Sequence, residues 1–345
     1  MPWFVAWDFP LYYSAGRLAP HEMYKTEVQQ ADQQRIYEEN IRPRRTYFFA
    51  IYLRPAVYRL VLTPLAQLPF WYAYMLWATL QAAGILVGLY LYSRPLGIPP
   101  YFWILLPMCP PVISTVAWGQ DAGLVFLAIA GAWSLSHRER WFAAGAVLAL
   151  SLVKWNLFLL LIPLMVAQRK WRMLSGFTAV ATLGAVASVA IAGWEGTAEY
   201  VQLLQHRDAD VHAAQMSSMR GLLVLLGAPA APVAAALVTL NCLLWWMLSR
   251  LDWRYAFAVA VTGCVSLSFH TMHYDSIFVL APLLLLRDDL YLTSLPFQIL
   301  FLLWMTPSPD FGLLKTLLIT APQFVVFACG LRVMRRMSIQ ATSSP

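Results

Sequence analysis

Residues 69–92 read PFWYAYMLWATLQAAGILVGLYLY and contain no charged side chain. About 20 apolar residues are enough for one helix to cross the hydrocarbon core of a bilayer. Further apolar segments follow almost to the end of the chain, at 101–117, 121–136, 141–153, 155–167, 173–193, 221–249, 255–267, 275–286, 290–306 and 313–331. The sequence therefore predicts an all-α polytopic membrane protein with about eleven transmembrane or partly inserted helices.

The composition of the whole chain agrees with this class. Of the 345 residues, 60% are hydrophobic and 12% are charged, whereas soluble domains carry about 25% charged residues. The net charge of +7 does not indicate nucleic-acid binding, because the basic residues punctuate apolar segments and form no stripe on a soluble domain. The four cysteines lie in apolar stretches without metal-ligand spacing, which predicts buried thiols and not disulfides: Cys109, Cys242, Cys264 and Cys329.

Basic loops set the predicted sidedness of the spans. Four stretches between or after apolar segments are basic: 137–140, 168–172, 250–254 and 332–336. Such short loops stay in the cytoplasm, so the chain between two of them crosses the membrane an even number of times. This parity predicts hairpins at 141–167 and 255–286, and a third at 101–136 if Arg94 marks the inner side. The N-terminus is then expected outside and the C-terminus in the cytoplasm, with the plasma membrane as the location.

The three hairpins are short and have polar tips. Their arms span roughly 18–25 Å at about 1.5 Å per residue, which is less than the hydrocarbon core of about 30 Å. The tips at 118–121, 154–156 and 270–275 should therefore lie below the outer membrane surface. Polar groups are tolerated at that depth only against protein or water, so we expect the tips to converge with the first segment on one outward-facing cavity.

The chain is predicted to have three parts: a first extracytoplasmic loop (1–68), a multi-spanning domain (69–334) and a cytoplasmic tail (335–345). Asp8 lies near the start of the first loop. Within this loop, 24–40 predicts an amphipathic helix on the outer leaflet, in which Thr26 and Gln29 have the spacing of a capping box. The helix is followed by basic residues suited to anionic headgroups, Arg42, Arg44 and Arg45.

Short stretches over most of the chain carry a resemblance to a known family. They are Asp8-Phe9 with Tyr12 and Ala15, Met23-Tyr24, Tyr52-Leu53-Arg54-Pro55 leading to Thr63-Pro64-Leu65-Ala66-Gln67-Leu68-Pro69, Gly119-Gln120-Asp121, Lys154, and Trp171-Arg172. In this layout the chain resembles the membrane enzymes of glycosyltransferase family 87, which have the GT-C architecture and use polyprenyl-phosphate sugars. Two features depart from the family pattern. Family members carry a transmembrane helix before the aspartate, whereas seven residues stand before Asp8 in this sequence, and Leu53-Arg54-Pro55 stands where the family has Tyr-Pro-Pro.

The resemblance implies an inverting transfer of one sugar, often mannose, from a polyprenyl-phosphate carrier to a hydroxyl of a glycan or glycolipid acceptor outside the cytoplasm. Membrane lipids are the expected surroundings, and no cofactor is required. The attacking hydroxyl must lose its proton, which a carboxylate can accept, so Asp8 is the expected general base. The phosphate leaving group needs fixed cations, and the expected candidates are Arg54, Arg59, Lys154 and Arg220.

The remaining candidate substrate-binding residues are Tyr12, Gln120, Asp121, His270, His273 and Asp275. Gln120 and Asp121 either bond sugar hydroxyls or cap the following helix. Lys154 either contacts phosphate or sugar, or snorkels to the interface. The two histidines and Asp275 contact substrate or only make the tip polar, and they are too few to predict a metal site.

Two other interpretations of the chain stay open. A transporter or flippase of lipid-linked saccharides would share the spans and the polar cavity, although such proteins usually contain internal repeats and this sequence shows none. A noncatalytic assembly partner or an inactive remnant is the other interpretation. Since family members carry a helix before the aspartate, we also expect the reading frame to begin upstream of Met1 and to encode about 20 further apolar residues.

Overall fold

The computed structural model describes residues 7–41, 49–94, 109–158, 161–206, 216, 218–268, 271–286, 323 and 325–336. Every regular element among these residues is a helix, which confirms the predicted all-α class. The predicted span 290–306, the first part of 313–331, and the residues Arg42, Arg44, Arg45 and His270 lie outside the described residues.

The first half of the chain contains α1 (Phe9–Arg17), α2 (Thr26–Asn40), η1 (Ala56–Tyr58), α3 (Arg59–Ala66), α4 (Phe70–Ser93), α6 (Pro110–Trp118), α7 (Ala122–His137), α8 (Trp141–Leu148), η4 (Ala149–Lys154), α9 (Trp155–Phe158) and α10 (Leu161–Ala167). The second half contains α11 (Trp171–His206), α12 (Met219–Leu225), α13 (Ala230–Leu248), α14 (Trp253–Ser266), η7 (His273–Val279) and α15 (Leu280–Leu285). A further helix covers 325–336.

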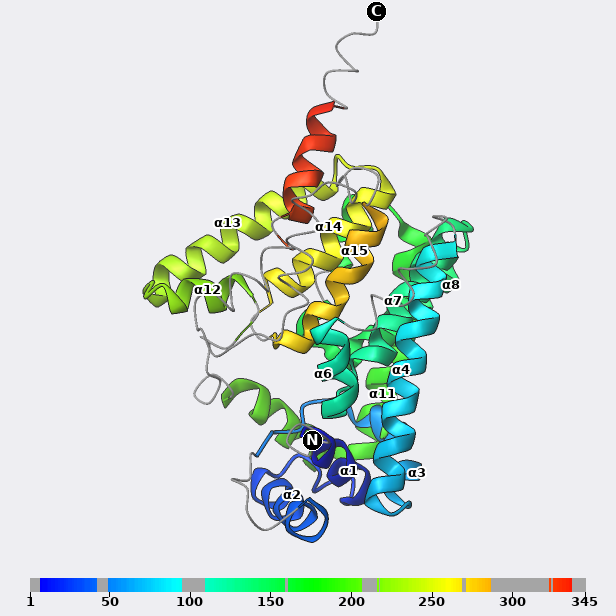
Figure 1. Ribbon diagram of the computed structural model, residues 1–345, viewed down its shortest axis with the longest axis vertical. Helices are drawn as coiled ribbons and strands as arrows, with labels where there is room; N and C mark the ends of the chain where they lie inside the picture. Colours follow the sequence, from blue (N-terminus) through cyan, green and yellow to red (C-terminus); the bar gives the residue numbers. More distant parts are fainter. Residues whose placement is uncertain are drawn as a thin grey trace, which may run out of the picture.

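Three of the described helices are long and apolar enough to cross a membrane. They are α4, the part of α11 from Trp171 to Gln205, and the part of α13 from Ala231 to Leu248. The decisive stretch 69–92 thus forms a helix with almost its predicted bounds. In Figure 1, α4 runs along the long axis, with α1–α3 at one end of the bundle and the helix 325–336 at the other.

A glycine with positive φ divides one predicted apolar segment and marks the end of another. The segment 221–249 is divided into α12 and α13 at Gly227 (φ 76°), and α11 has a kink at Gly193 (φ 70°). A left-handed backbone costs glycine little because it has no Cβ. Beyond its kink, α11 reaches the N-terminal residues, where the Tyr200 ring lies 4.8 Å from that of Tyr24.

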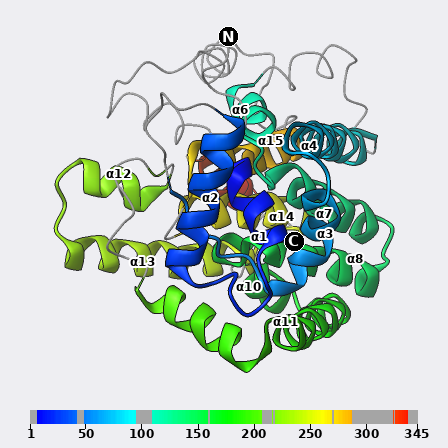
Figure 2. The same ribbon diagram turned by 90° about the horizontal axis from the view of Figure 1, so that it is seen from below.

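The described residues before α4 (7–41 and 49–69) form a packed cap over one end of the bundle. Aromatic and aliphatic side chains of α1 and its neighbours share a core with the first turns of α4, including Phe9, Tyr12, Tyr24, Ile36, Tyr52 and Trp77. Seen from below, α1 and α2 lie across the middle of the bundle (Figure 2). The cap therefore brings the start of the chain against the ends of the membrane hairpins.

The predicted helix at 24–40 exists, but its predicted capping box is wrong. Lys25 occupies the N-cap position, and no side chain caps the helix. Gln29 instead accepts a hydrogen bond from the backbone N–H of Tyr52 at 2.7 Å, and Gln33 donates to the carbonyl of Ala50 at 2.9 Å. The two glutamines satisfy the backbone of an extended segment, which would otherwise be buried without partners.

Helices α8 and α11 cross with their backbones in close contact. A Cβ on Gly145 would lie 1.8 Å from the carbonyl oxygen of Met173, and one on Gly176 would lie 2.0 Å from that of Phe142. Small residues allow such approaches between membrane helices, where packing and not water exclusion drives association. This crossing positions η4, which follows α8 and carries Lys154.

We expect Gly176→Ala to destabilise the protein by about 1–3 kcal/mol, the usual cost of overpacking. Gly184, on the same helix, is the matched control, because nothing lies within 4 Å of an added Cβ there and Ala favours a helix by about 1 kcal/mol over Gly. Thermal unfolding in detergent measures both. Equal unfolding temperatures for the two variants would contradict the close crossing.

Candidate functional site

The start of α1 is fastened to the tip of the α6–α7 hairpin. The backbone N–H of Asp8 donates to the carbonyl of Trp118 at 2.9 Å. The tip turns at Gly119 (φ 74°), where a Cβ would lie 2.8 Å from the Cβ of Phe9, and the indole of Trp77 donates to the Gly119 carbonyl at 2.8 Å. Only glycine fits this turn, after which Gln120 contacts Asp8 and Tyr12 and Asp121 contacts Arg54.

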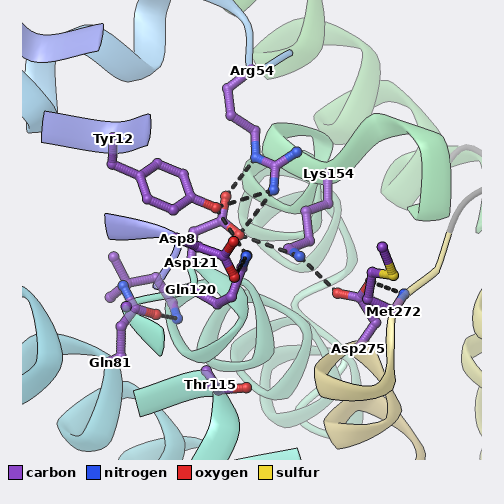
Figure 3. A network of polar contacts seen from close by, with 12 residues as sticks. Asp8, Tyr12, Arg54, Gln81, Thr115, Gln120, Asp121, Lys154, Met272 and Asp275 are labelled. Atoms are coloured by element: carbon purple, nitrogen blue, oxygen red, sulfur yellow. Dashed lines mark hydrogen bonds and ion pairs between the residues drawn. The ribbon is translucent and has the colours of Figure 1, made fainter. Parts of the chain in front are cut away.

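Asp8 is the end of a chain of hydrogen bonds (Figure 3). Gln120 Nε2 donates to Asp8 Oδ2 at 2.6 Å, and the Tyr12 hydroxyl donates to Gln120 Oε1 at 3.0 Å. Arg54 Nη2 donates in turn to the Tyr12 hydroxyl oxygen at 3.3 Å. Among the described residues, Asp8 Oδ1 has no hydrogen-bond partner.

A second network joins Arg54 to the other two hairpin tips. Arg54 pairs with Asp121 through two hydrogen bonds, of 2.6 and 3.1 Å. Lys154 Nζ lies 3.3 Å from Asp121 Oδ1 and 2.6 Å from Asp275 Oδ1. Asp275 also accepts from the backbone N–H of Met272 at 3.0 Å. Residues of the segment before α4 and of all three predicted tips therefore meet at one buried cluster.

Among the described residues the cluster holds three carboxylates and two cations, and of these carboxylates Asp8 is the one with no cation within hydrogen-bond distance. Its side chain lies before the first span and is almost wholly buried (9% exposed). Burial raises the pKa of Asp8 to about 6, although the hydrogen bond from Gln120 and the charge of Lys154 oppose the rise. A carboxyl group with such a pKa is ionised near neutral pH and can still accept a proton.

The side chains predicted to bind substrate divide into two groups. Tyr12, Arg54, Gln120, Asp121, Lys154 and Asp275 belong to the cluster. Arg59 lies apart from it and donates to the carbonyl of Leu18. Arg220 lies in the first turn of α12, which lies to one side of the bundle in Figures 1 and 2. His273 opens η7.

The expectation that Asp121 caps α7 is wrong. Asp121 occupies the N-cap position, but its side chain makes no capping hydrogen bond and is committed to Arg54 and Lys154. The alternative that Lys154 snorkels to the interface is also wrong, because its side chain is only 3% exposed.

Sequence reasoning missed two residues at the site. Tyr274 presents its ring 5.0 Å from Lys154 Nζ and 6.1 Å from the Trp118 ring. Gln81 is fully buried on α4, and its Oε1 accepts from the backbone N–H of Leu124 at 3.1 Å. Gln81 could have been found from the sequence, because it is a lone amide in the middle of the apolar stretch 69–92.

The family model described as glycosyltransferase family 87 matches residues 52–271, well over half of the chain. This match confirms the family expected from the sequence. The matched range includes Arg54, Asp121 and Lys154, whereas Asp8 precedes it. No curated protein and no solved structure matches the chain.

We expect Lys154→Met to destabilise the protein by about 3–5 kcal/mol, because removing one partner leaves buried carboxylates without compensation. Adding Asp275→Asn should restore part of the loss. Lys25→Met is the matched control, since its pair with Glu195 (3.0 Å) is exposed and such pairs contribute little. Unfolding temperatures in detergent test the series. A double variant less stable than Lys154→Met would contradict the assigned pairing.

Proposed function

The chain belongs to glycosyltransferase family 87, and from that premise we propose that it transfers a single sugar from a polyprenyl-phosphate carrier to an acceptor hydroxyl. Mannose is the proposed sugar, a glycan or glycolipid the proposed acceptor, and the extracytoplasmic side of the plasma membrane the proposed location. In this orientation the N-terminal cap faces outward and the C-terminus is cytoplasmic. Asp8 is the proposed general base.

The observation that carries the proposal is the hydrogen bonding of the two Asp8 carboxylate oxygens. One oxygen is held by a neutral amide, and the other has no partner among the described residues. An acceptor hydroxyl that donates to this second oxygen would lose its proton to Asp8 as it attacks the anomeric carbon. The bond from that carbon to the phosphate oxygen breaks, and the phosphate leaves with the electron pair. A base whose pKa lies near the working pH suits this transfer.

Arg54 is the proposed contact for the phosphate. Its Nε and Nη2 groups bind Asp121 and Tyr12, whereas Nη1 has no partner among the described residues. The side chain is 16% exposed, compared with 3% for Lys154. A fixed guanidinium stabilises developing negative charge without reorganising. We therefore propose that Arg54 contacts the donor and that Lys154 mainly balances the charges of Asp121 and Asp275.

We expect Asp8→Asn to lower sugar transfer at least about a hundredfold, the usual scale of general-base catalysis. The assay measures polyprenyl phosphate released from polyprenyl-phosphate mannose in membranes that contain the full chain. Asp32→Asn is the matched control, because Asp32 is also a buried carboxylate of the cap (5% exposed) and pairs with Arg35 on its own helix. Transfer by Asp8→Asn within twofold of the unmodified chain would reject the base assignment.

We expect kcat/KM to fall about tenfold per pH unit below an acidic limb, because only the ionised form of Asp8 accepts the proton. The raised pKa places this limb near pH 6. A pH profile measured with saturating acceptor and limiting donor checks the expectation. A limb at the ordinary value of a carboxyl group, about 3.9, would contradict it.

A further inference from the structure

Three hydrogen bonds link Arg54 to Asp8 through Tyr12 and Gln120, and we call this chain the relay. In each bond the residue nearer to Arg54 is the donor. A guanidinium has no acceptor, so the Tyr12 oxygen must accept from Arg54 Nη2. The one hydroxyl proton of Tyr12 is then available for Gln120 Oε1 at 3.0 Å. This contact turns the Gln120 amide so that its N–H groups face Asp8 Oδ2 at 2.6 Å.

The far end of this relay is rigid. Asp121 fixes the guanidinium of Arg54 through two hydrogen bonds, of 2.6 and 3.1 Å, and the Tyr24 hydroxyl donates to the Arg54 carbonyl at 2.8 Å. The ring of Tyr12 packs 5.6 Å from the ring of Trp77. Neither the donor nor the phenol can turn away without breaking buried contacts, so the orientation of the Gln120 amide is enforced.

We propose, on the basis of the glycosyltransferase function above, that Tyr12 and Gln120 are positioning residues that keep Asp8 ionised and leave its Oδ1 oxygen to receive the acceptor's proton. The two residues act through Asp8 and need not touch the substrate.

The relay opposes a proton on Asp8 Oδ2. Such a proton would face the N–H groups of Gln120 unless the amide reversed. A reversed amide would point its N–H groups at the Tyr12 oxygen, which already accepts from Arg54. The Tyr12 proton would then lose its acceptor in the relay. Without the phenol oxygen, reversal of the amide would cost far less.

Several charged or titratable groups face Asp8 from other elements, and the experiment must separate them from the relay. They are Lys154 from η4, Asp121 at the start of α7, Arg54 before η1, and Tyr274 from η7. Substitution of Tyr12 or Gln120 leaves the formal charge of all four unchanged. A shift in the acidic limb of these variants therefore reports on the hydrogen bonds.

We expect Tyr12→Phe to raise the acidic limb of kcat/KM by about one pH unit, which corresponds to about 1.4 kcal/mol. Gln120→Leu should raise it further, because it removes the donor to Asp8.

Tyr58→Phe is the matched control. Tyr58 is also buried and packs against Trp77, at 6.3 Å between ring centroids, but its hydroxyl has no hydrogen-bond partner among the described residues. Its acidic limb should stay in place. Unchanged limbs in both Tyr12→Phe and Gln120→Leu, with Asp8→Asn still inactive, would overturn the relay and leave the proposed function standing.

A second measurement does not depend on turnover. Infrared titration of the protonated carboxyl band of Asp8, identified by its loss in Asp8→Asn, reports the protonation of this group directly. The band should titrate at higher pH in Tyr12→Phe than in the unmodified chain and in Tyr58→Phe. An identical titration in all three proteins would reject the relay even if the chain transferred no sugar.

Discussion

The paired charges of Asp121, Arg54 and Lys154 are the interaction on which the site depends. Asp121 accepts two hydrogen bonds from Arg54 and lies 3.3 Å from Lys154. The three residues come from the cap and from two different hairpins. A buried carboxylate is strongly unfavourable without such partners, so the cap can dock on the bundle only in the register that brings these charges together.

Docking of the cap in this register depends on two close backbone contacts elsewhere in the structure. Gly119 allows the α6–α7 tip to lie against Phe9, and the α8–α11 crossing sets the position of η4 and so of Lys154. The charged side chains of the tips, Asp121, Lys154 and Asp275, are buried, and Arg54 of the cap contacts Asp121. Packing in the apolar part of the bundle therefore fixes the geometry of the charged part, and a methyl group added at a crossing would disturb both.

Much of this organisation could be predicted from the sequence. Span 69–92 followed from length and apolarity alone, and the convergence of the three tips followed from basic loops and parity. The pairing of Arg54 with Asp121 could not be predicted, because each residue alone has the pattern of a substrate ligand and their contact depends on how the cap docks. The capping box at Thr26 failed for a related reason, since Gln29 was needed by the backbone of Tyr52.

The charge balance of the cluster suits the proposed reaction. With Asp8 ionised, the cluster of described residues has three carboxylates and two cations, and this excess negative charge disfavours an anionic donor beside it. When Asp8 accepts the acceptor's proton, the cluster becomes neutral at the moment when charge accumulates on the leaving phosphate. Electrostatic interactions are strong where water is excluded, so this neutralisation removes a repulsion that would otherwise grow along the reaction. Among the described residues, the hydrogen-bond partner of the Asp8 side chain is a neutral amide. This serves the balance, because a cation at the position of Gln120 would hold Asp8 as a permanent anion and weaken it as a proton acceptor.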